Sequence, residues 1–194
     1  IASVASMVLG TTAAFALHHY KSKLQNVHRL LMTAPLVLPD ILMGMSLLLL
    51  FISLGMNLSL LTVTLAHVTF CMSYVTLVVL ARLDGFDFTL LDAARDLGAS
   101  RWTALRKIML PLLAPGILAG GLLAFTLSID DYVVTFFVKG AGSDTLPTLV
   151  YSMIKKSREL PVINALSTIL LVVTFAAVAL SQRLTRRPAG GGRN

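Results

Sequence analysis

Long apolar runs, separated by short polar connections, dominate this chain. Five of them approach the roughly 20 residues that an α-helix needs to cross a membrane, and they occupy positions 1–17, 30–54, 58–81, 108–129 and 162–180. The first run is short and begins at Ile1 without a Met, so we interpret it as a span cut inside or just before its start. The pattern predicts an all-α fold, a polytopic transmembrane helical bundle.

The charges fit this interpretation. Hydrophobic residues make up 56% of the chain and charged residues 13%, which is typical of a membrane protein. Segments 18–29, 82–107 and 181–194 hold 3, 5 and 4 of the 16 Lys and Arg residues, so the positive-inside rule places them, and the C-terminus, in the cytoplasm. The net charge of +7 is thereby explained by topology and by membrane lipid as a partner, and nucleic acid is not expected.

The loop 82–107 is the longest charge-dense passage between apolar runs. Asp87 or Thr89 can cap a short helix, Gly98 can end it in the left-handed conformation, and Ser100 can cap a second helix. The loop cannot bury its apolar edge in lipid because its other faces are charged, through Arg95, Asp96, Arg101, Arg106 and Lys107. We therefore predict two short helices, joined by a sharp bend, that meet a protein partner on the aqueous side.

The motif Asp92-Ala93-Ala94, followed by Gly98, Ile108 and Leu110-Pro111, resembles the EAA loop of the membrane subunits of bacterial ABC importers. Asp92 stands where that family usually has Glu. The resemblance implies the type I permease fold, the bacterial inner membrane, and docking to a cytoplasmic ATP-binding subunit that binds the ATP. The residues implied in this coupling are Leu91, Asp92, Ala93, Ala94, Leu97, Gly98, Ala99 and Ser100.

Acidic residues within or beside the spans indicate a polar path. Asp40 follows Pro39, and Asp130 and Asp131 end the fourth run, followed by Tyr132. A carboxylate in hydrocarbon is costly unless it faces a cavity or a partner, and no Lys or Arg lies at comparable depth. The sequence therefore favours a cationic ligand. Two alternatives stay open: Asp40 caps the backbone freed by Pro39 or pairs with another subunit, and the adjacent pair begins a solvated loop.

The external segment 130–161 contains a turn and then an amphipathic stretch from Leu146, which we expect to form a helix in the outer interface. Four passages resemble the second membrane subunit of spermidine/putrescine ABC importers: Pro35–Ile41, Ser128–Val133, Leu146–Met153 and Asn164–Thr168. The resemblance implies a permease domain over 1–182, a basic cytoplasmic tail over 183–194, and five spans of an expected six. It also implies a substrate path lined by Asp40, Asp130, Asp131 and Tyr132.

The partners implied are the ATP-binding subunits, a second permease subunit in a heterodimer, and an external solute-binding protein. No catalytic motif, cofactor motif or metal-ligand spacing is recognisable, and lone Cys71 is expected to be a packing residue, so we do not expect an enzyme. Two other functions remain possible at this point. One is an importer for an opine, thiamine, an amino-acid derivative or ferric ion; the other is a channel or scaffold without an ATPase.

Overall fold

The computed structural model describes residues 1–20, 23–156 and 160–185. All regular structure in these residues is helical, as the apolar runs predict. The helices are α1 (Ala2–His19), α2 (Gln25–Val37), α3 (Asp40–Ser53), α4 (Leu60–Leu83), α5 (Thr89–Asp96), α6 (Arg101–Ala104), the π-helical turn η1 (Leu105–Met109), α7 (Leu110–Asp130), α8 (Val133–Val138), α9 (Leu146–Lys156) and α10 (Leu160–Thr185).

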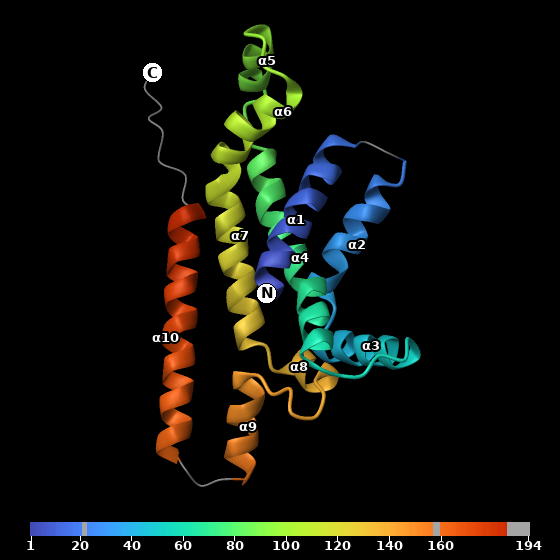
Figure 1. The fold of residues 1–194 in the computed structure, drawn as a ribbon, viewed down its shortest axis with the longest axis vertical. Helices are drawn as coiled ribbons and strands as arrows, with labels where there is room; N and C mark the ends of the chain where they lie inside the picture. The colour runs from blue at the N-terminus through green and yellow to red at the C-terminus, as the bar shows by residue number, and fades with distance from the viewer. Residues whose placement is uncertain (21–22, 157–159, 186–194) are drawn as a thin grey trace.

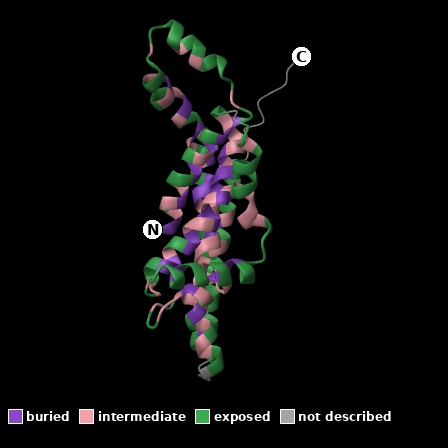
Figure 2. Ribbon diagram, turned by 90° about the vertical axis from the view of Figure 1, so that its right-hand side faces the viewer, coloured by how far each residue is buried: buried purple, intermediate pink, exposed green. Residues whose placement is uncertain are grey.

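The bundle is built around α4, which packs against both α1 and α7, while α10 covers the other side of α7 (Figure 1). Buried residues follow the middle of the bundle (Figure 2). On α4 they include Cys71, Val75, Val79 and Leu83, none of which is exposed to solvent. Cys71 is thus a packing residue, as the sequence predicts. The outward faces of α3 and α10 carry large exposed apolar side chains, as a membrane-embedded surface requires.

Close packing at Val75 depends on small residues from two neighbouring helices. A Cβ added to Gly10 of α1 would lie 2.7 Å from Val75 Cβ and 2.8 Å from the carbonyl oxygen of Met72. A Cβ added to Gly120 of α7 would lie 3.4 Å from Val75 Cα, an ordinary contact. At Val75 the α1–α4 contact is therefore tighter than the α4–α7 contact, and of these two glycines only Gly10 cannot be replaced without a clash.

The second apolar run, predicted as one span over 30–54, is two helices. Proline disfavours the helical conformation in the residue before it, and Leu38, which precedes Pro39, is extended with ψ 136°. The axes of α2 and α3 differ by 112°, so α3 lies across the bundle and packs against α8 (Figure 1). The break places Asp40 in the first turn of α3.

The fourth run is less interrupted than its prolines suggest. Residues Arg101–Asp130 form one 30-residue helical rod that continues through Pro115. Its irregular part is the π-helical turn Leu105–Met109. That turn contains Lys107, which lies four positions before Pro111. In a regular α-helix the carbonyl group of Lys107 would clash with the ring of Pro111.

Among the described residues, three helices are long and apolar enough to cross a membrane, and a fourth span results if the bent pair α2–α3 counts as one. They are Leu60–Leu83, Arg101–Asp130 and Leu160–Arg183. The helix α1, with 18 residues, does not meet the same criterion. The count of five spans therefore stays a prediction.

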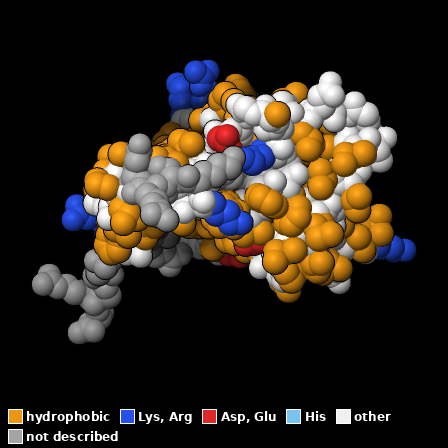
Figure 3. Space-filling model, turned by 90° about the horizontal axis from the view of Figure 1, so that it is seen from below, with side chains coloured by type: hydrophobic (Ala, Val, Ile, Leu, Met, Phe, Trp, Pro, Cys, Tyr) orange, Lys and Arg blue, Asp and Glu red, His pale blue; other side chains and the backbone are white. Residues whose placement is uncertain are grey.

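The two predicted functional regions lie at opposite ends of the bundle (Figure 1). α5 and α6 form one tip, and α3, α8 and α9 form the other. Figure 3 views that second end, where hydrophobic side chains cover most of the visible surface and acidic groups show only in small areas. The external segment turns between Lys139 and Asp144, which form an ion pair, and the expected helix follows as α9.

Candidate functional site

The loop 82–107 has the local structure that its sequence predicts. The Asp87 carboxylate accepts hydrogen bonds from the Thr89 N–H at 3.0 Å and the Thr89 hydroxyl at 2.7 Å, and these bonds hold the pKa of Asp87 below its ordinary value. Gly98 ends the first helix with φ +86°. Ser100 caps the second helix by accepting from the Thr103 N–H.

This loop presents an apolar surface edged by charge. Leu97 is 90% exposed and Trp102 is 65% exposed, whereas Leu91 and Phe86 pack against the buried core and anchor the loop to the bundle. Beside them lies an open pocket with both signs of charge, lined by Asp92, Arg95, Asp96, Ala99, Ser100 and Arg101. Exposed apolar side chains ringed by charges are typical of a protein-docking surface.

At the opposite end, the four residues predicted to line a substrate path border one pocket of about 320 Å³. The structure thus brings together Asp40 from α3, Asp130 from the end of α7, and Asp131 and Tyr132 from the link to α8. Aromatic side chains of Phe70 and Tyr74 complete part of the wall. Among the described residues that line the pocket there is no Lys, Arg or His.

The two adjacent aspartates differ sharply in their surroundings. Asp131 accepts hydrogen bonds from the Val134 N–H at 3.3 Å, and from the Thr135 N–H and hydroxyl at 2.8 Å each. His67 Nε2 lies 3.3 Å from the same carboxylate, whose side chain is 10% exposed. Burial raises the pKa of Asp131, but the bonds from His67 and Thr135 outweigh burial and hold it below its ordinary value.

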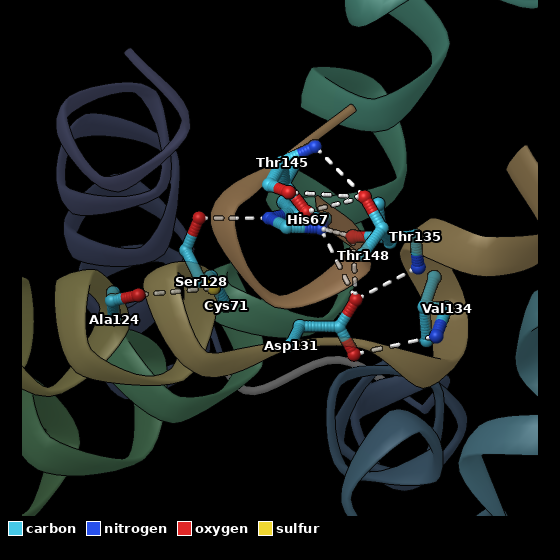
Figure 4. A network of polar contacts seen from close by, with 9 residues as sticks. All are labelled: His67, Cys71, Ala124, Ser128, Asp131, Val134, Thr135, Thr145 and Thr148. Atoms are coloured by element: carbon cyan, nitrogen blue, oxygen red, sulfur yellow. Dashed lines mark hydrogen bonds and ion pairs between the residues drawn. The ribbon is translucent and has the colours of Figure 1, made fainter. Parts of the chain in front are cut away.

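The His67 side chain lies at the centre of this network (Figure 4). Its Nε2 is 2.8 Å from Thr135 Oγ1, and its Nδ1 is 2.7 Å from Ser128 Oγ. Because the Thr135 hydroxyl donates to Asp131, its oxygen accepts from His67 Nε2–H. One chain of hydrogen bonds therefore joins α4 (His67), α7 (Ser128) and the α8 segment (Thr135 and Asp131).

Asp40 and Asp130 are, in contrast, exposed residues. Within the part of the chain that the structure describes, neither carboxylate forms a hydrogen bond or an ion pair with another residue. Asp130 and Tyr132 also line a second pocket of about 490 Å³, shared with α9 and α10. There the Tyr132 ring lies 4.7 Å from the Tyr151 ring, and Lys155 Nζ lies 4.8 Å from the centre of the Tyr151 ring.

Sequence reasoning missed His67. It predicts three carboxylates without basic partners, and for Asp131 this is wrong because His67 contacts it. The available signal was the polarity of His67 itself: an imidazole in the middle of an apolar run is costly without a partner. Its partners lie more than 60 residues away along the chain, and spacing within one helix cannot reveal them.

Residues 6–188 match the family described as binding-protein-dependent transport system inner membrane component. The chain belongs to this family. It is therefore a permease subunit of a binding-protein-dependent ABC importer, a class of inner-membrane protein that works with ATP-binding subunits and a binding protein. The EAA-like motif and the helical bundle are consistent with this membership.

Curated relatives of this permease subunit come from several bacteria. It is 43% identical over 186 residues to the spermidine/putrescine transport system permease protein PotC of Haemophilus influenzae, covering 96% of this chain and 72% of that protein. PotC of Escherichia coli K12 is also 43% identical, over 95% of this chain and 69% of the relative. The putrescine transport system permease protein PotI of the same strain is 42% identical, over 96% of this chain and 70% of the relative.

A solved structure shares the fold of this permease subunit. It is the inward-facing MetNI methionine ABC transporter, with a TM-score of 0.75 over 95% of this chain and 90% of the matched chain. The sequence identity is 16%, so this likeness concerns the fold alone.

Proposed function

We propose that this subunit forms part of the translocation path for polyamines, as its relatives' names state for them. The observation that carries the proposal is the pocket that combines Asp40, Asp130 and Asp131 with no basic lining residue among those described. Polyamines are flexible chains with several ammonium groups. Carboxylates spaced along a cavity attract such cations, and the rings of Tyr74 and Tyr132 add favourable faces for them.

The proposal also gives the loop 82–107, from here on the coupling loop, the role of transmitting ATP hydrolysis to the bundle. Asp92 to Ser100, with the exposed Leu97, would enter a groove on one cytoplasmic ATP-binding subunit. This orientation puts the C-terminus in the cytoplasm and the aspartate pocket on the external side, where a solute-binding protein delivers its ligand. A second, related permease subunit completes the path as a heterodimer.

The mechanism follows from this geometry. ATP-driven closure of the ATP-binding subunits displaces the coupling loop. Leu91 and Phe86 transmit the displacement because they pack on the core formed by α4 and α7. The same two helices carry His67, Ser128 and Asp130 at the other end, so their movement changes access to the pocket. The carboxylates hold the polyamine only until the opposite side opens.

The test is uptake of labelled spermidine and putrescine by cells that carry the complete transporter. Replacing Asp130 by Asn, or Asp40 by Asn, is expected to lower uptake strongly while the complex still assembles and hydrolyses ATP. An assembled, ATP-hydrolysing wild-type complex that imports no polyamine contradicts the substrate. A competition panel with opines, thiamine, amino-acid derivatives and ferric ion then identifies the solute.

A further inference from the structure

The buried network around His67 separates two aspartates that the sequence presents as equivalent. A carboxylate offers about four lone-pair sites to hydrogen-bond donors. Asp131 already receives bonds from two backbone N–H groups and the Thr135 hydroxyl, with His67 Nε2 beside it. Oδ2 is therefore fully engaged, and Oδ1 receives the Val134 N–H, so Asp131 has much less accepting capacity left for the ammonium group of a ligand. Asp130 and Asp40 keep all of theirs.

The network also fixes the elements that carry these two free carboxylates. His67 is 3% exposed and Thr135 is fully buried, so their contact is shielded from water and is stronger than a surface hydrogen bond. Through Thr135 it ties α8 to α4, and through Ser128 it ties α7 to α4. Asp130 is the last residue of α7.

Asp40 is connected to the same network through helix packing. α3, which begins at Asp40, packs directly on α8. The contact is close: a Cβ added to Gly44 would lie 2.7 Å from Phe137 Cδ2 and 3.3 Å from Val134 Cα. A displacement of α8 therefore moves α3 and Asp40 with it. His67 therefore lies in the packed connection between the helices that carry Asp40 and Asp130.

We propose that His67 is a positioning residue: it sets the spacing of Asp40 and Asp130, and this spacing selects polyamines by the distance between their ammonium groups. Asp131 then holds the start of α8 in place through its hydrogen bonds and does not bind the substrate. This inference rests on the proposed polyamine function. It adds a residue that does not touch the substrate and yet determines which length of polyamine fits between Asp40 and Asp130.

The first experiment measures KM for putrescine, cadaverine and spermidine in the assembled transporter. His67→Leu removes both ring nitrogens and is expected to change the ratio of the putrescine and cadaverine KM values by about tenfold, the factor associated with one lost hydrogen bond to a charged group. His67→Gln places an amide N–H near the position of Nε2 and should restore the wild-type ratio. In an Asp130→Asn background, His67→Leu should change the ratio no further.

Ser73→Ala is the matched control. Ser73 lies on α4, is 1% exposed, and its hydroxyl has no hydrogen-bond partner among the described residues, so its replacement should leave all KM ratios unchanged. A purely structural role of His67 would lower the amount of active transporter and leave the ratios intact. That result, or a His67→Gln variant that behaves like His67→Leu, overturns the proposal.

A second experiment does not depend on the substrate. Val134 on α8 is 1% exposed, so Val134→Cys in a Cys71→Ser background should react slowly with a membrane-impermeant thiol reagent. Adding His67→Leu should increase the labelling rate by about tenfold because α8 is released from α4. An unchanged rate contradicts the positioning role even if the transported solute is not a polyamine. Accelerated labelling without polyamine uptake contradicts only the substrate.

Discussion

The imidazole of His18 stacks on the ring of Phe88, with centroids 5.1 Å apart and ring planes 14° apart. His18 lies in the last turn of α1, and Phe88 immediately precedes α5 in the coupling loop. His18 Nε2 also lies 4.0 Å from Asp84 Oδ1. The start of the coupling loop is thus held by α1 as well as by α4, and α1 in turn packs against α4 and α7.

Replacing Phe88 by Ala should therefore loosen the coupling loop at its start. A stacked aromatic pair contributes about 0.5–1.5 kcal/mol beyond its buried area, so transport per ATP hydrolysed should fall by up to about tenfold. Parallel measurement of uptake and ATP hydrolysis in proteoliposomes checks this. His19→Ala is the control, because His19 makes a ring contact with the adjacent Tyr20 and should leave the ratio unchanged. An intact ratio in Phe88→Ala would exclude the stack from coupling.

Gly98 offers a second test of the coupling loop. Its φ is +86°, and apart from its chain neighbours no atom of the described residues lies within 4 Å of an added Cβ, so alanine introduces backbone strain without a clash. The strain costs about 1–2 kcal/mol. We expect Gly98→Ala to lower transport per ATP several-fold, and a bulkier residue to lower it further, as the loop loses the shape that docks.

Gly55 is a matched control for that experiment. Its φ is +68°, and it lies at the opposite end of the molecule between α3 and α4. Apart from its chain neighbours, the part of the chain that the structure describes places no atom within 4 Å of an added Cβ. Gly55→Ala should cost a similar amount of stability while coupling stays normal. Equal loss of coupling in both variants would show that strain anywhere in the subunit is sufficient, and would remove the special role of Gly98.

These local features were largely readable from the sequence. The bend at Gly98 and the cap at Ser100 depend on residues close in the chain, and the structure confirms both. The long apolar runs gave the helical class for the same reason. The proline at position 39 indicated an interruption of the second span, but not the 112° change of direction, because an apolar run of spanning length carries no information on the angle between its two halves. The contact between His67 and Asp131 was missed because it depends on how α4, α7 and α8 pack against one another, and the sequence of a single helix does not show this.

Packing around Val75 yields a paired stability prediction. Gly10→Ala places a methyl group 2.7 Å from Val75 Cβ and 2.8 Å from a backbone carbonyl that cannot move cheaply. Overpacking of this kind costs about 1–3 kcal/mol, so the unfolding temperature of the purified complex should fall. Gly120→Ala meets the same Val75 at 3.4 Å and removes a flexible residue from α7. It should leave that temperature unchanged or raise it. Equal destabilisation by both would contradict the tighter packing of α1 against Val75.

The hydrogen-bonded Asp131 carboxylate predicts that the stability of the fold depends on pH. Burial raises the pKa of Asp131, but hydrogen bonds from His67 and Thr135 lower it below the ordinary 3.8. A carboxyl with a lowered pKa in the folded state stabilises the fold at pH values above 3.8, and this contribution is lost as the pH falls through the lowered value. Asp131→Asn lacks it at every pH. The unfolding temperature of the wild type should therefore exceed that of Asp131→Asn at neutral pH, and the gap should close in acid.

The adjacent residue supplies the comparison for this last experiment. Asp130 is exposed and makes no hydrogen bond or ion pair with any other residue in the described ranges, so Asp130→Asn should unfold at the wild-type temperature at every pH. The two assays would then distinguish the roles of the two neighbouring carboxylates. Asp131→Asn lowers the unfolding temperature at neutral pH, whereas Asp130→Asn lowers polyamine uptake while the complex stays stable. A gap for Asp131→Asn that stays constant from neutral to acid pH would mean that its charge does not hold α8. In that case the contact with His67 would be only a neutral hydrogen bond.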